Sequence, residues 1–163
     1  MPGDSVPGDR SPTTSTPNAS SVQFRRILVA AGLRQRDPTV FRPVWDLVTR
    51  FGADATVCHV EMRSTAAAGN ESDGSPANAE ETQILRDLRA AVVEALGTKG
   101  HDLPIKILHG DPGQRVCEYA DFLDCDLIVL GPREKASIAH TLRGSVSKYV
   151  VGNTRRAVLV LGS

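Results

Sequence analysis

Aromatic residues and surplus positive charge are both scarce in this sequence. Only 4% of the residues are aromatic whereas 40% are hydrophobic, so a folded core would consist mainly of valine, leucine, isoleucine and alanine. The 19 lysines and arginines are balanced by 19 aspartates and glutamates. A protein that binds duplex DNA or RNA needs a basic face to displace counterions from the phosphates. The balanced charge therefore argues against nucleic acid as a partner.

Long hydrophobic runs are missing as well. The uninterrupted apolar stretches span a few residues, whereas a membrane-spanning helix needs about 20. The first residues after Met1 also lack the apolar run of a secretory signal. We therefore expect no membrane insertion and a cytoplasmic location.

The three cysteines, Cys58, Cys117 and Cys125, form no C-x-x-C pair and are odd in number. This usage is typical of a reducing compartment, where cysteine acts as a small hydrophobic residue. His59 follows Cys58 directly, but neighbouring residues of a strand point to opposite faces and cannot bind one metal ion together. We expect no metal site.

Composition divides the chain into a tail and one domain. Residues 1–22 contain four prolines and many serines and threonines, and such a segment buries too little apolar surface to offset the entropy of ordering it. We expect a disordered N-terminal tail, either simply solvated or serving as a modifiable, partner-binding extension. Residues 23–163 are long enough for a single α/β domain.

Short apolar runs alternate with helical patterns along this domain. Five strands are expected, at 27–31, 56–60, 104–108, 126–130 and 157–161. Helices are expected from about residue 42 to 51 (with Pro43 in the first turn or at a kink), at 80–96, at 112–123 and from 144 onward. Parallel neighbours need right-handed crossovers, which place helices on both faces. The pattern predicts a three-layer α/β fold with an open parallel sheet.

Ligands of such sheets bind beyond the carboxyl ends of the strands, at the point where the strand order reverses. Three segments follow strands there: 30–32, 60–62 and 131–134. Neither a G-x-G-x-x-G fingerprint nor a Gly-Lys-Ser/Thr triplet is present. Gly144 and Ser145 open a helix, whose free N–H groups and positive dipole end can bind an anion. The alternative is that Ser145 only caps that helix.

A catalytic reading of the same region is weaker. His140 and Ser145 lie five residues apart and could act as base and nucleophile. No G-x-S-x-G elbow and no orienting carboxylate accompany them. An ATP-using enzyme would also need a Ser/Gly-rich loop after the first strand, which is missing. We expect no enzyme activity.

Several segments resemble the universal stress protein family. They are Gly110-Asp111-Pro112, the run DLIVLG at 126–131, the run LRGSVSKYV at 142–150, and Val158-Leu159-Val160. The first strand and His59-Val60 also fit, so the likeness covers about residues 24–162. It implies a five-stranded sheet of order 3-2-1-4-5, the adenine nucleotide alpha hydrolase-like fold, a homodimer, and in many members a bound adenine nucleotide such as ATP or AMP.

The nucleotide-binding members carry G-x-x-G, nine residues, then G-S/T. Gly131, Gly144 and Ser145 fit this pattern, but Glu134 replaces the second glycine. A carboxylate facing phosphates at about 4 Å costs about 1 kcal/mol even in water. Pro132 adds to this loss because it has no N–H to donate.

The family also places an aspartate near the adenosine, where this chain has Gly32. Three basic residues could compensate for these losses: Arg133, Lys135 and Arg143 could neutralise an anion, or they could simply pair with Glu134.

The resemblance and these departures leave two hypotheses. In the first, the protein is a stress-response regulatory protein that binds an adenine nucleotide in a modified pocket. Phosphates and ribose would then contact Gly131, Arg133, Gly144, Ser145 and Val146, and the adenine side would be lined by Ala31, Gly32 and Val60. In the second, it is a nucleotide-free dimeric interaction module.

In either case the dimer is expected to form through the last strand, 157–161. An apolar strand at the edge of a sheet can pair with its own copy about a two-fold axis.

Overall fold

A computed structural model describes residues 23–32, 41–62, 76–131 and 145–161. The side chains of residues 76–78 and of Ser145 fall outside this description. The predicted tail, 1–22, and the loop that contains Arg133 and Glu134 also lie outside the described residues.

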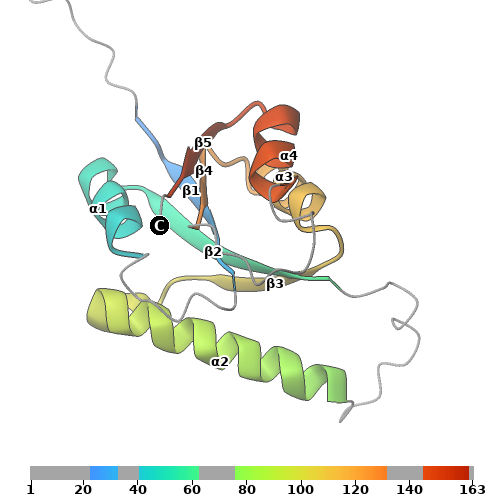
Figure 1. Cartoon of the computed structure of the whole chain (residues 1–163). Coiled ribbons are helices and arrows are strands. Elements are labelled where there is room, and N and C mark those ends of the chain that lie inside the picture. The colour runs from blue at the N-terminus through green and yellow to red at the C-terminus, as the bar shows by residue number, and fades with distance from the viewer. Residues whose placement is uncertain (1–22, 33–40, 63–75, 132–144, 162–163) are drawn as a thin grey trace, which may run out of the picture.

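The sheet has five strands, all parallel, in the order β3-β2-β1-β4-β5 (Figure 1). The strands are β1 (Arg26–Ala30), β2 (Asp54–Glu61), β3 (Ile105–His109), β4 (Leu127–Leu130) and β5 (Ala157–Val160). β1 and β4 are central and carry near-continuous buried runs, as strands covered on both faces require. The predicted fold class and strand order are confirmed.

Helices cover both faces of the sheet (Figure 1). α1 (Phe41–Phe51) and α2 (Pro76–Leu96) pack on one face, and α3 (Pro112–Phe122) and α4 (Ser145–Asn153) pack on the other. The core is accordingly split by the sheet into two clusters. Val29, Val57 and Val92 belong to the α1/α2 side, and Leu28, Val116 and Val150 belong to the α3/α4 side.

Some element boundaries differ from the sequence prediction. α2 begins at Pro76 rather than at residue 80, and proline suits the first turn of a helix because no N–H is needed there. α2 ends at Leu96 as expected, but a 3-10 helix, η3 (Gly97–His101), follows it directly. Gly97 adopts a φ of +64°, which glycine tolerates better than other residues. Pro43 lies in the first turn of α1.

The cysteines behave as small hydrophobic residues. Cys58 and Cys125 are buried, Cys117 is partly buried, and all three are free thiols. Burial, with a smaller contribution from Cys125, raises the pKa of Cys58 to about 12, so its thiol stays protonated. Within the described part of the chain, no helix combines the length and apolar character needed to cross a membrane.

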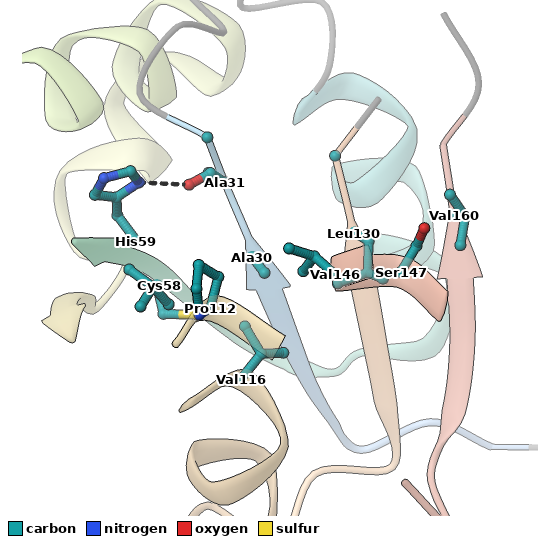
Figure 2. Close-up of a pocket in the computed structure, with 13 residues that line it drawn as sticks. Ala30, Ala31, Cys58, His59, Pro112, Val116, Leu130, Val146, Ser147 and Val160 are labelled. Carbon is teal, nitrogen blue, oxygen red and sulfur yellow. Dashed lines mark hydrogen bonds between the residues drawn. The ribbon is translucent and has the colours of Figure 1, made fainter. Parts of the chain in front are cut away.

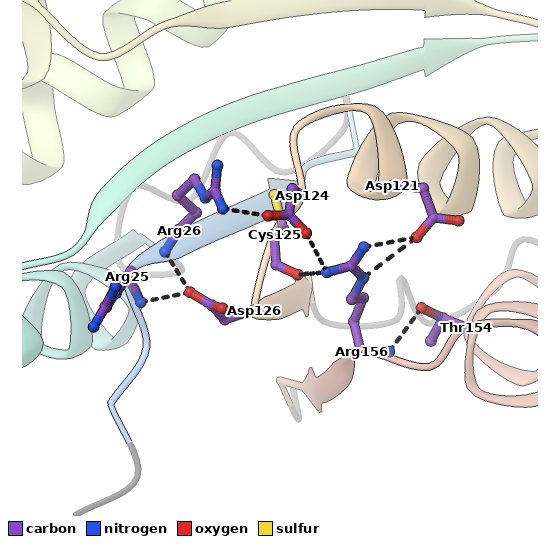
Figure 3. A network of polar contacts seen from close by, with 8 residues as sticks. All are labelled: Arg25, Arg26, Asp121, Asp124, Cys125, Asp126, Thr154 and Arg156. Carbon is purple, nitrogen blue, oxygen red and sulfur yellow. Dashed lines mark hydrogen bonds and ion pairs between the residues drawn. The ribbon is translucent and has the colours of Figure 1, made fainter.

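An ion network ties the amino ends of three strands together (Figure 3). Arg156, just before β5, bonds to Asp124 at 2.9 Å, to the carbonyl of Cys125 at 2.9 Å and to Asp121 at 3.2 Å. Arg26, at the start of β1, also pairs with Asp124. The network therefore joins β1, β4 and β5 to the end of α3.

Asp126 ties β1 to β4 through the backbone at the start of β1. Its Oδ2 accepts the backbone N–H groups of Arg25 and Arg26 at 2.6 and 2.8 Å. These bonds, that of Arg26 first, lower the pKa of the Asp126 carboxyl below its usual value. The carboxylate thus fixes where β1 begins beside β4.

We predict that Asp126→Asn lowers the free energy of unfolding at pH 7 by about 1–2 kcal/mol, because an amide accepts these N–H groups less strongly than a carboxylate. The folded pKa of Asp126 is depressed, so its contribution is present above the unfolded value of about 3.9 and is lost as the pH falls through the folded pKa. Urea unfolding at pH 7 and pH 3 should therefore show a smaller difference between variant and wild type at the lower pH. The exposed Asp46→Asn is the matched control, and an equal deficit at both pH values would contradict the assignment.

Candidate functional site

A cavity of about 290 Å³ opens at the carboxyl ends of the strands (Figure 2). β1 contributes Ala30 and the residues after it, and β4 contributes Leu130 and Gly131. Along the sheet, β2 and β3 follow outward from one edge of β1, and β4 and β5 follow outward from its other edge. The cavity therefore lies at the point where the strand order reverses, the usual ligand position in such folds.

Five of the residues predicted for the site line this one cavity: Ala31, Gly32, Val60, Gly131 and Val146. They lie in or directly after β1, β2, β4 and α4, so the first and the last of them are more than a hundred positions apart in the sequence. Ser145 begins α4, but its side chain is not among those described. Arg133 and Gly144 lie outside the described residues, and the assignment of all eight residues to a nucleotide stays a prediction.

Other residues of the cavity were not expected from the sequence. They are Cys58, His59, Pro112, Val116, Leu130, Ser147 and Val160, whereas Ala30 belongs to the expected segment 30–32. Pro112 and Val116 belong to the start of α3, which follows the Gly110-Asp111-Pro112 motif. Since Asp111 caps α3 by accepting the N–H of Gln114 at 2.9 Å, this motif also sets where the wall of the cavity begins.

The wall is mostly apolar. Alanine, valine, leucine and proline carbons make up most of it, and the neutral thiol of Cys58 adds a further apolar surface. The described polar side chains are those of His59 and Ser147 (Figure 2). Such a wall suits a flat, weakly polar ring system whose edge is recognised by a few backbone groups.

His59 is the buried polar residue of this wall. It is 7% exposed, and both of its ring nitrogens are bonded. Nδ1 lies 2.8 Å from the carbonyl oxygen of Ala31, and Nε2 lies 3.0 Å from a carboxylate oxygen of Glu61 (Figure 2 draws the first of these bonds). The ring therefore links β2 to the end of β1.

No group of three or more metal-ligating side chains occurs among the described residues. The pair Cys58 and His59 is divided between the two faces of the sheet, since Cys58 packs with the α3/α4 cluster and His59 bonds to Ala31. His140, the base of the catalytic alternative, lies outside the described residues.

α4 reaches the cavity with its first turn. Val146 and Ser147 line the cavity, and Val150, one turn later, is fully buried under the helix. The helix packs on α3 at Gly113, where an added Cβ would lie 2.8 Å from the ring of Tyr149. The contact with this glycine thus sets how closely α4 approaches α3.

Residues 23–162 match the sequence profile of the Universal stress protein family. The chain belongs to this family. The match covers the whole region in which the sequence motifs were found, so the predicted membership is confirmed.

Individual relatives agree with this assignment. The chain is 29% identical over 82 residues to universal stress protein Sll1388 of Synechocystis sp., a match that spans about half of either protein (50% of this chain, 53% of the relative). The structure of UspA from Lactobacillus plantarum has a TM-score of 0.63 at 22% identity, covering 86% of this chain and 99% of that one. A universal stress protein in complex with cAMP has a TM-score of 0.62 at 20% identity, covering 86% and 98%. At these identities the two structures show a shared fold.

We predict that Gly113→Ala destabilises the protein by about 1–3 kcal/mol, because the new methyl group would overlap the Tyr149 ring and push α4 outward. Gly152→Ala on α4 is the matched control, since nothing lies within 4 Å of its Cβ position. That change should stabilise the protein by up to about 1 kcal/mol, as alanine is a better helix former. Equal effects of the two substitutions in thermal unfolding would contradict the close contact.

Proposed function

We propose that this universal stress protein is a stress-response regulatory protein that binds an adenine nucleotide, ATP or AMP, without converting it. The observation that carries the proposal is the cavity at the reversal of strand order, lined by five residues that family resemblance assigns to the nucleotide. The solved relative in complex with cAMP supports an adenine nucleotide as the ligand class. We expect the protein to act in the cytoplasm.

The size of the cavity supports a binding mode in which only part of the nucleotide lies inside it. About 290 Å³ lies at the lower end of the range of roughly 300–1,000 Å³ for small-molecule pockets. Such a volume suits the base and part of the ribose, which would lie against Ala31, Gly32 and Val60. The phosphates would extend past Gly131 and the start of α4 toward Arg133, Gly144 and Ser145, with Val146 beside the ribose.

Two departures from the family pattern modify this pocket. Glu134 places a negative charge where the pattern has glycine, and Gly32 removes a carboxylate near the adenosine. Gly32 is exposed, and among the described residues no atom lies within 4 Å of the position that its Cβ would occupy. A side chain at position 32 would therefore meet open space, so crowding does not explain the glycine.

We expect Glu134→Gly to strengthen ATP binding by about fivefold, because it removes a repulsion of about 1 kcal/mol from the phosphates. Isothermal titration of the full chain with ATP and with AMP in the presence of Mg²⁺ measures the effect. Glu134→Gln removes the charge but keeps the length of the side chain, so it should reproduce most of the gain. Gly32→Asp should add a further gain, since it restores the missing carboxylate in open space.

Purified wild-type protein should also release an adenine nucleotide when it is denatured and analysed by mass spectrometry. A blank spectrum, together with no heat of binding and no thermal shift with ATP or AMP for any of these variants, would favour the nucleotide-free interaction module. That second function is supported by the two departures themselves.

We further propose that the protein is a homodimer paired through the strand at 157–161. β5 is an edge strand that pairs with β4 on one side alone. The N–H groups of Ala157 and Leu161 point to β4, so by alternation those of Val158 and Val160 point to the open edge. Val160 is 48% exposed. An antiparallel pairing of two such edges is self-complementary.

Val158→Pro should convert this dimer to a monomer in sedimentation velocity, because proline removes an outward N–H while the bonds to β4 remain. Val158→Ala is the matched control, since it loses side-chain carbons but keeps the N–H, and it should stay dimeric. Leu159 is less suitable for the test because by alternation its N–H points to β4, so proline there would break the sheet itself. A dimer that persists in the folded proline variant would place the interface elsewhere.

A further inference from the structure

The end of β1 is held to β2 in two different ways. The N–H of Ala31 donates to the carbonyl of Cys58 at 2.9 Å, which continues the strand pairing. The carbonyl of Ala31 accepts a hydrogen bond from a side chain, the Nδ1 of His59, at 2.8 Å. Both backbone polar groups of Ala31 are therefore bonded to β2, at the point where the chain leaves the sheet and enters the cavity wall.

The ring that makes this bond is itself fixed. Its Nε2 lies 3.0 Å from Glu61, and the two side chains are 9% and 17% exposed. Glu61 comes two residues after His59 on β2, so both side chains lie on the same face of the sheet. A buried ring with partners at both nitrogens has little freedom to rotate, and it holds the carbonyl of Ala31 in one orientation.

We propose that His59 is a positioning residue that fixes the Ala31–Gly32 peptide as the adenine-side wall of the cavity. The inference rests on the proposed function and names a residue that the family pattern of the site does not include. Gly32 has no side chain with which to anchor this segment, and no atom in the described part of the chain lies within 4 Å of its Cβ position. The bond from His59 supplies the anchor from the neighbouring strand.

Two substitutions at His59 separate positioning from simple packing. His59→Asn places an amide NH₂ near the position of Nδ1 and can still donate to Ala31. His59→Leu fills a comparable volume without a donor. His109→Asn is the matched control, because His109 lies one strand away, pairs with Glu81 at 3.6 Å and does not line the cavity.

Amide hydrogen exchange of the ligand-free protein gives the first readout. In His59→Leu, exchange at the Ala31 N–H should accelerate about tenfold relative to the Val29 N–H inside β1, because the end of the strand loses its second tether. His59→Asn should remain within about threefold of wild type, and His109→Asn should not change the ratio. An unchanged ratio in His59→Leu, or no rescue by asparagine, would overturn the positioning role.

Titration with ATP and AMP gives the second readout. His59→Leu should bind about tenfold more weakly than wild type, whereas His59→Asn and His109→Asn should bind within about threefold. If exchange follows the prediction but neither wild type nor any variant binds either nucleotide, the positioning of Ala31 by His59 is supported and the proposed function fails. If wild type binds and His59→Leu binds equally well, the proposed function stands and the role of His59 in shaping the site is overturned.

Discussion

The parallel pairing of β1 with β4 in the centre of the sheet is the constraint on which the candidate site depends. β1 leads to α1 on one face, and β4 leads toward α4 on the opposite face. The two crossovers therefore diverge at the carboxyl ends of adjacent strands, and no helix of the described residues fills the space between them. A sheet that added all its strands in one direction would close this crevice with consecutive helices.

The two ends of the same pair of strands are built differently. At the amino ends, Asp126 and the pairs formed by Arg156 and Arg26 tie β1, β4 and β5 together. At the carboxyl ends, β1 is held by the backbone bonds from Ala31 to Cys58 and from Gly131 to Ala30 and by the side chain of His59. Apart from His59 and Ser147, the described side chains of the wall are apolar. Charged bonds thus set the register at the amino ends, whereas at the cavity end the described polar side-chain contacts are those that His59 makes with Ala31 and Glu61.

Much of this arrangement could be predicted from the sequence because it depends on local patterns. The apolar run at 127–130 predicts a strand whatever its neighbours are, and the periodicity of 80–96 predicts a helix. The family motifs then supply the strand order, which local patterns do not contain. Ala31, Gly32 and Gly131 could be assigned to one site because carboxyl ends of parallel strands meet at one edge of the sheet.

The features that were missed depend on contacts between distant segments. Alternation along β2 correctly separates Cys58 from His59 but does not reveal that His59 bonds to a carbonyl on β1. The closeness of Gly113 to Tyr149 joins two helices that lie more than thirty positions apart in the sequence. A sequence shows glycine at position 113, but only the packing shows that a larger side chain would displace α4.

The two departures from the family pattern bear on different halves of the proposed ligand. The described wall around Ala31 and Val60 is apolar and backbone-rich, so base recognition there depends mainly on shape, and the loss of one carboxylate at Gly32 removes a single polar contact. Glu134 instead acts on charge, and its repulsion grows with each phosphate that a ligand adds. If the proposed ligand binds, the modified pocket would on this reasoning keep adenosine recognition better than triphosphate affinity. It would also discriminate less in favour of ATP over AMP than a pocket with glycine at position 134.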